Sequence, residues 1–290
     1  MANKAFPFKL SSRAEPFRAE SRDLRFTSKR MTIAANTTTF TRIAVELRPP
    51  AARVTLNNPP LNVIDIPMME ELRAALEQIE IRPEISALVI AGSESAFSGG
   101  VDIAAHTPDN VRGMLADFHS VIRSVVSSSK LTIASVRRHC LGGGAELALM
   151  CDVIYASPDS VWGFPEIKLA CYAPVASVAL SSIVGQKLAA ELLLTGRTLS
   201  GEEALAARLV NGLADDPETL VTECIQRVSQ LSPAALRLAK KAFYAWDSIH
   251  FDKGLMRAEQ IYTDELMKTV DAQEGIAAFI ERRRPNWSGR

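Results

Sequence analysis

The 290-residue sequence lacks an excess of charge of one sign, a paired cysteine motif and a long apolar run. Its 33 basic and 33 acidic side chains give a formal net charge of +0, so no overall field favours nucleic acid or an anionic membrane as a partner. The four cysteines show no CxxC spacing. This argues against a disulfide frame or a zinc site and predicts buried thiols in a reducing compartment, the cytoplasm. No apolar run approaches the roughly 18 residues that a membrane span needs.

The motifs of several common enzyme classes are also missing. The chain contains no GxSxG, no HExxH and no Walker A run, which disfavours serine hydrolases, zinc proteases and P-loop enzymes. The glycines at 142–144 lack the GxGxxG spacing of a dinucleotide-binding fold. The histidines are not clustered as ligands, and His106 and His139, near two glycine loops, are interpreted as rim or core residues. We therefore predict no metal and no separate cofactor.

Residues 1–30 differ in composition from the rest of the chain. Eight basic side chains outnumber three acidic ones there, and prolines and serines interrupt any periodicity. An Arg- and Ser-rich leader is typical of a transit peptide. The acidic residues and the absence of an amphipathic pattern favour a disordered extension over residues 1–35, with Met31 as an alternative start.

From residue 36 onward, predicted strands and helices alternate. Short apolar runs at 54–56, 85–91, 132–136 and 152–157 predict strands, and apolar residues at helical spacing follow Asp65, Thr107 and the glycines at 142–144. This alternation predicts an α/β fold with parallel pairing over residues 36–215. Beyond that, helical periodicity dominates, so residues 216–290 are predicted to form a helical C-terminal region.

Two glycine-bearing loops and two glutamates are the candidates for chemistry. One loop spans 96–103 (AFSGGVDI) and the other spans 141–146 (LGGGAE), each directly after a predicted strand. Backbone N–H groups from two such loops could form an oxyanion hole, although most glycine-rich turns serve only as tight connections. Glu146 and Glu166 both lie in apolar stretches, where burial raises a carboxyl pKa and suits it to proton transfer. Either acid taken alone is better explained as a structural cap, but the two together favour a two-carboxylate site.

These segments carry a resemblance to the crotonase (enoyl-CoA hydratase/isomerase) family. Residues 96–103 and 141–152 are similar to its two oxyanion loops, 162–167 (WGFPEI) resembles its second-glutamate segment, and 274–285 (EGIAAFIERRRP) resembles its C-terminal signature. The resemblance covers residues ~45 to 287, with the motifs in the family's order. It implies a spiral of stacked ββα units with a helical C-terminal trimerisation region, and a homotrimer or homohexamer.

The resemblance also implies the roles of particular residues. A CoA thioester, which is the substrate and not a cofactor, would place its carbonyl oxygen between the N–H groups of Gly99 and Gly143. Glu146 and Glu166 would act as the acid/base pair that holds and activates water. Arg53 and the arginines at 282–284 are candidates for the CoA phosphates, the latter equally explained as a solvated helix end. The remaining predicted substrate contacts are Ser98, Gly100, Val101, Asp102, Ile103, Gly142, Tyr172 and Pro174.

Residues 168–177 (KLACYAPVAS) depart from the common family pattern of a proline followed by a glycine cluster. Pro174 has no N–H to donate, so we expect the water and the acyl group to sit differently. With residues 60–66 (PLNVIDI), this segment resembles the cyclohexa-1,5-diene-1-carbonyl-CoA hydratases, which implies a cyclic dienoyl-CoA substrate. The alternatives are a general enoyl-CoA hydratase, an isomerase, which can manage with one carboxylate, and a non-catalytic binding member of the fold.

Overall fold

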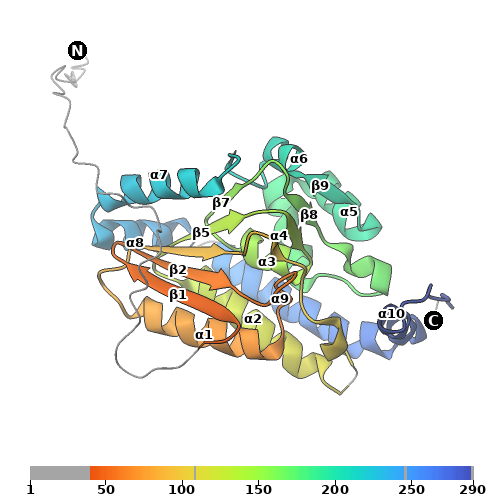
Figure 1. Ribbon diagram of the computed structural model, residues 1–290. Coiled ribbons are helices and arrows are strands. Elements are labelled where there is room, and N and C mark those ends of the chain that lie inside the picture. Colours follow the sequence, from red (N-terminus) through yellow and green to blue (C-terminus); the bar gives the residue numbers. More distant parts are fainter. Residues whose placement is uncertain (1–39, 108, 245–246, 289–290) are drawn as a thin grey trace, which may run out of the picture.

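The computed structural model describes residues 40–107, 109–244 and 247–288. The predicted leader at 1–35 and Pro108 lie outside these residues. The larger of two sheets has the strand order β1-β2-β3-β5-β7-β10 (Figure 1). Its strands are β1 (Ile43–Arg48), β2 (Ala51–Leu56), β3 (Ala87–Ala91), β5 (Leu131–Val136), β7 (Val153–Ala156) and β10 (Gly212–Leu213). Only the β1–β2 pair is antiparallel, and the other pairs are parallel.

A second, smaller sheet is built from short strands that alternate along the chain with those of the larger sheet. It has the order β4 (Ala96–Ser98), β6 (His139–Leu141), β8 (Val161–Gly163) and β9 (Thr198–Ser200), and β4, β6 and β8 run parallel. The chain thus alternates between the sheets: β3 leads to β4 and α2 (Val111–Ser127), and β5 leads to β6 and α3 (Gly143–Leu149). The predicted α/β spiral of ββα units is confirmed.

Helix starts follow the capping residues that the sequence predicts. Helix α1 (Ile66–Glu80) begins after Asp65, whose side chain accepts a hydrogen bond from the N–H of Met68. Helix α6 (Gly201–Ala206) begins with a reciprocal capping box between Ser200 and Glu203. The helix expected from Thr107 begins only at Val111, after a short 3-10 turn, η1 (Ile103–Ala105), and a further turn in which the N–H groups of Asn110 and Val111 donate to the carbonyl of Thr107.

The central strands β3 and β5 of the large sheet are buried on both faces, which explains their continuous apolar runs. In β3, Leu88 and Ile90 belong to the main core beside α1 and α2, whereas Ala87 and Val89 belong to a second cluster on the opposite face. Helix α7 (Pro217–Ser229) covers that opposite face (Figure 1). It therefore packs as part of the α/β core, although the sequence pattern assigns it to the separate region 216–290.

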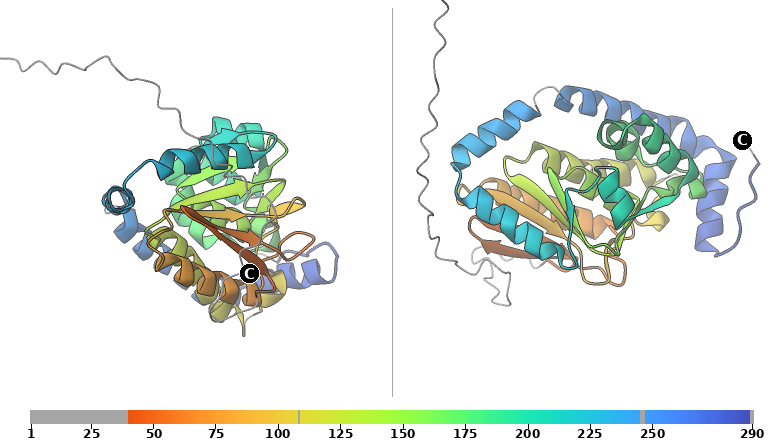
Figure 2. Two further views of the ribbon diagram at one scale, coloured as in Figure 1. Left: turned by 60° about the vertical axis from the view of Figure 1, so that its left-hand side comes forward. Right: turned by 90° about the horizontal axis from the view of Figure 1, so that it is seen from above.

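The remaining helices surround one end of the core. Helix α4 (Pro174–Val184) and α5 (Gln186–Thr195) follow the 3-10 turn η2 (Pro165–Leu169). Helices α8 (Pro233–Phe243) and α9 (Asp247–Asp264) then run around the outside of the core, as Figure 2 shows, and α9 packs on α4. After η3 (Leu266–Lys268), α10 (Val270–Ile280) returns to contact η2. In the described part of the chain, no helix is both long and apolar enough to cross a membrane.

Candidate active site

The site lies where three neighbouring strands of the small sheet end. Strands β4, β6 and β8 are parallel, with His139 paired to Ala96 on one side and to Val161 on the other. Because parallel strands end at the same edge of a sheet, the segments that follow them meet there. Gly99 and Gly100 follow β4, Gly142 follows β6, and Glu166 follows β8. Sheet topology thus brings together both glycine loops and the second glutamate.

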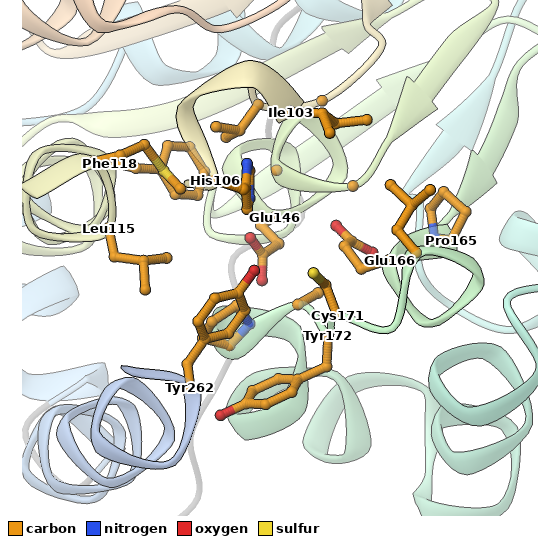
Figure 3. A pocket seen from close by; sticks show the side chains of 18 of the residues that line it. Ile103, His106, Leu115, Phe118, Glu146, Pro165, Glu166, Cys171, Tyr172 and Tyr262 are labelled. Carbon is orange, nitrogen blue, oxygen red and sulfur yellow. The ribbon is translucent and has the colours of Figure 1, made fainter. Parts of the chain in front are cut away.

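These segments enclose a cavity of about 90 Å³ (Figure 3). The carboxyl groups of Glu146 and Glu166 point into it from neighbouring positions, and Tyr172 and Tyr262 lie on one side. The predicted residues that line it are Gly99, Gly100, Val101, Ile103, Gly142, Gly143, Glu146, Glu166, Tyr172 and Pro174.

Gly142 allows the two carboxyls to approach each other. Its backbone has φ +52° and ψ −131°, a conformation that residues with a Cβ rarely adopt. A Cβ at this position would lie 2.7 Å from Oε1 of Glu166. Glycine is therefore required at position 142 for two reasons: the backbone conformation of the turn into α3, and the space that the Glu166 carboxyl occupies.

The N–H groups of Gly99 and Gly143, the two predicted oxyanion donors, differ in the hydrogen bonds that they make in this structure. Gly143 is the first residue of α3, where the helix supplies no acceptor for an N–H group. The N–H of Gly99 donates to the carbonyl of Leu61 at 2.7 Å. Gly99 is thus in the cavity wall as predicted, but its N–H would have to share or leave the Leu61 carbonyl to reach a thioester oxygen.

Glu146 is almost completely buried and is held by the start of α4. Its side chain is 2% exposed, and its Oε1 accepts a hydrogen bond from the N–H of Ala176 at 2.9 Å. Burial raises the pKa of Glu146, while the Ala176 hydrogen bond and then the neighbouring His119 oppose that rise. Pro174 begins α4 without an N–H, as predicted, and the amide two residues later holds the carboxylate instead.

Glu166 lacks comparable support for its charged form. Its Oε2 is buried and has no hydrogen-bond partner among the described residues. Burial, followed by the charge of Glu146, raises the pKa of Glu166 to about 8. The Ala176 N–H favours the charged form of Glu146, whereas Oε2 of Glu166 has no donor, so Glu166 is the carboxyl of the pair that the structure disposes to hold a proton. Such an arrangement suits one carboxylate and one carboxylic acid.

Three of the residues predicted to bind substrate do not line the cavity. Ser98 is buried and donates its hydroxyl to the carbonyl of Asn62 at 2.8 Å, so it supports the glycine loop from behind. Asp102 caps η1 by accepting from the N–H of Ala104. Arg53, in β2, forms a two-pronged ion pair with Glu218 on α7, with contacts of 2.6 and 2.8 Å.

In the described structure Arg53 joins α7 to the sheet, and its contact with a CoA phosphate stays a prediction. In the run at 282–284, Arg283 is likewise paired, with Glu274 and Glu281. A sequence shows that a cation is present but not which carboxylate the fold places beside it.

Helices distant in sequence complete the cavity wall, and the sequence analysis assigned none of their residues to the site. They are Met114, Leu115, Phe118 and His119 of α2, Tyr262 of α9 and Ile276 of α10, together with Leu169, Cys171 and Ala173 near η2. Most occupy apolar positions at helical spacing, which a sequence cannot distinguish from core positions. His106 also lines the cavity: its Nδ1 lies 3.0 Å from the carbonyl of Asp102, and burial lowers its pKa.

The four cysteines are buried and unpaired, as predicted. In the described ranges, no group of three or more His, Cys, Asp or Glu side chains is placed to hold a metal ion.

Comparison with known proteins agrees with this geometry. The family model for enoyl-CoA hydratase/isomerase matches residues 50–290. A cyclohexa-1,5-dienecarbonyl-CoA hydratase from Thauera aromatica is 34% identical over 239 residues, covering 82% of this chain and 93% of that protein. A probable enoyl-CoA hydratase from Rhizobium meliloti is 35% identical, with coverage of 87% and 99%. An enoyl-CoA hydratase structure from Mycobacterium avium subsp. paratuberculosis superposes with a TM-score of 0.77 at 27% identity, covering 86% and 99%.

The chain therefore belongs to the enoyl-CoA hydratase/isomerase (crotonase) family and is an enzyme of the enoyl-CoA hydratase type.

Proposed function

We propose that this chain adds water across the activated double bond of an α,β-unsaturated acyl-CoA, with a cyclic dienoyl-CoA as its preferred substrate. The observation that carries the reaction is the pair of buried carboxyls in one cavity, with Glu146 held by the N–H of Ala176 and Oε2 of Glu166 without a partner. Such a pair offers a base and an acid at the same pH.

In the proposed reaction, the Glu146 carboxylate takes a proton from water as the water oxygen bonds to the unsaturated carbon. The displaced π electrons move toward the thioester carbonyl, whose oxygen gains negative charge. The N–H of Gly143, joined by that of Gly99, stabilises this charge. The Glu166 carboxyl then gives its proton to carbon, which completes the addition of H₂O.

The wall beside the catalytic pair favours a ring. Tyr172 and Tyr262 contact each other edge to face with ring centroids 5.2 Å apart, and the Tyr172 hydroxyl donates to the carbonyl of Ala258 on α9. This fixed aromatic surface suits packing against a flat ring. The 34% identity to the cyclohexa-1,5-dienecarbonyl-CoA hydratase supports the same substrate.

The test is kcat/KM for a cyclohexa-1,5-diene-1-carbonyl-CoA, crotonyl-CoA and a long linear enoyl-CoA under identical conditions. We expect the cyclic thioester to be preferred over crotonyl-CoA by about 10-fold or more, since each unfilled methylene position forfeits roughly 1–3 kcal/mol of discrimination. Equal values, or a preference for crotonyl-CoA, would overturn the cyclic substrate and leave general enoyl-CoA hydration. That second candidate is favoured by the 35% identity to a probable enoyl-CoA hydratase.

The assembly and location of the enzyme are part of the same proposal. Leu238 and Phe243 of α8 are 59% and 74% exposed in the single chain, so a second copy could cover them. We propose a homotrimer or homohexamer in the cytoplasm that uses no cofactor besides the CoA of its substrate. The molar mass in solution, measured by light scattering, tests the assembly: a monomer would contradict it.

A further inference from the structure

His119 is a buried polar residue of the cavity wall that the proposed reaction does not yet use. It lies on α2, is 0% exposed and lines the same cavity as Glu146 and Glu166. Its Nδ1 is 2.6 Å from Oε1 of Glu259 on α9. Arg123, one turn further along α2, also binds this oxygen, at 3.0 Å. A carboxylate on α9 therefore fixes an imidazole in the wall of the cavity that Glu146 and Glu166 also line.

The partner of Nδ1 determines which imidazole nitrogen carries the proton. Glu259 also accepts from Arg123, whose charge favours the ionised form of this carboxyl, so Glu259 is a carboxylate that can only accept. Nδ1 must then carry a proton, and when the ring is neutral Nε2 is an acceptor. Nε2 is buried and has no hydrogen-bond partner in the described ranges. A buried acceptor of this kind needs a polar partner from the ligand.

The chemistry of the ligand limits what that partner can be. The following step rests on the proposed function. Beyond its thioester, an enoyl or cyclic dienoyl group is a hydrocarbon, and the thioester oxygen belongs to the glycine loops. The one polar atom that the reaction brings to the unsaturated end is the oxygen of the added water.

The geometry points to His119 as a third catalytic residue, whose Nε2 accepts a hydrogen bond from the water that is added and from the hydroxyl of the product. One water proton passes to the Glu146 carboxylate, and the water oxygen bonds to carbon. The second hydrogen stays on that oxygen and donates to Nε2 without being transferred. Carbon receives its proton from Glu166, as before. With one O–H directed at Glu146 and the other at His119, a lone pair of the water faces the substrate.

Two substitutions of His119 test the contributions of its two ring nitrogens separately. Asn places its amide nitrogen near the position of Nδ1, so His119→Asn keeps a donor for Glu259 and removes the Nε2 position. Gln reaches the Nε2 position, so His119→Gln keeps an acceptor in the cavity and gives up the Glu259 contact. We expect His119→Asn to lower kcat for hydration about 10- to 100-fold, with KM changed less than about 3-fold. His119→Gln should keep most of kcat.

A second reaction tests the same site without the added water. Exchange of the α-protons of butyryl-CoA with D₂O needs a carboxylate and the oxyanion donors, but no added water. We expect His119→Asn to exchange at the wild-type rate. Ser124→Ala is the matched control, because Ser124 lies on the same helix and its hydroxyl donates to the carbonyl of Ser120. It should leave both reactions and the Tm unchanged.

Each outcome has one meaning. Hydration by His119→Asn within about 2-fold of wild type would overturn the role of Nε2. An equal loss of hydration and exchange, with a large fall in Tm, would show that His119 is structural and would also overturn it. If the wild-type protein exchanges protons of butyryl-CoA but hydrates none of the thioesters, the proposed function fails first, and this inference fails with it.

Discussion

At the scale of single residues, the two glutamates have the same side chain but different environments. Glu146 accepts from a backbone N–H at the start of α4, whereas Oε2 of Glu166 has no partner in the described structure. The difference comes from the local chain path, since Glu146 faces a helix start and Glu166 faces Gly142. The base and acid roles that we propose for them rest on those surroundings and not on the residue type.

Replacing either carboxyl by its amide should slow hydration strongly. In Glu146→Gln and Glu166→Gln we expect kcat to fall by about 10²–10⁴-fold, because each variant removes a proton acceptor or donor from the transition state. Binding of a CoA thioester, measured by calorimetry, should change little. Near-normal hydration by either variant would contradict the two-carboxylate mechanism.

The raised pKa of Glu166 also predicts how stability depends on pH. Its folded-state pKa of about 8 exceeds the ordinary value of 4.5, so the folded state binds more protons between these pH values. Stability is therefore lost as pH rises through this window, by at most about 1.4 kcal/mol per pH unit. Glu166→Gln removes this loss, and its Tm relative to wild type should be higher at pH 8.5 than at pH 5.5. A Tm difference that is the same at both pH values would show that Glu166 is not the group responsible.

At the scale of elements, the turn between β6 and α3 determines the spacing of the catalytic pair. Gly142→Ala would introduce a Cβ 2.7 Å from Oε1 of Glu166 and force an unfavourable backbone conformation. We expect it to lower stability by about 1–3 kcal/mol and kcat by at least about 10-fold.

Gly113→Ala in α2 is the control, because a Cβ there meets nothing within 4 Å. In an exposed helix it should raise stability by about 0.5–1 kcal/mol and leave kcat unchanged. Chemical denaturation and steady-state kinetics measure both effects. If the two alanine variants behaved alike, the spacing argument for Gly142 would be lost.

At the scale of the whole molecule, the C-terminal helices close the site that the core begins. Tyr262 of α9 and Ile276 of α10 line the cavity, and α10 packs directly on η2, which carries Glu166. Gly275 is the point of contact, since a Cβ there would lie 2.2 Å from the carbonyl oxygen of Leu169. The segment that carries Glu166, the proposed acid, is therefore supported by a helix more than a hundred residues later in the chain.

Gly275→Ala tests this support. We expect a loss of about 1–3 kcal/mol from overpacking, or roughly 2–10 °C in Tm, with a fall in kcat because η2 must shift. Gln273→Ala, at an exposed position of the same helix, should change neither quantity. A Gly275→Ala variant with wild-type Tm and kcat would show that α10 does not position Glu166.

Local features of the fold could be predicted because neighbouring residues determine them. Asp65 caps α1, and Ser200 with Glu203 caps α6, through contacts that span three residues. The apolar runs of the strands and the glycines after β4 and β6 likewise mark the ββα repeat and the loops of the site. The family motifs at 96–103, 141–152 and 162–167 extended this local information to the acid/base pair.

Contacts between distant residues could not be predicted in this way. Nothing near Arg53 in the sequence indicates that Glu218 will bind it, and nothing near His119 indicates Glu259. The packing of α7 on the large sheet could not be predicted for the same reason, because an amphipathic helix looks alike in sequence whether it covers a sheet or stands apart.

The sequence alone determined the α/β class, the repeating unit and the two glutamates, since periodicity, capping and motifs act over a few residues. Only the tertiary structure decided which carboxyl has N–H donors, which cations are already paired and which helices wall the cavity. Charge and hydrogen bonding depend on distances of 3–4 Å in space, and those distances exist only after segments far apart in the chain have packed together.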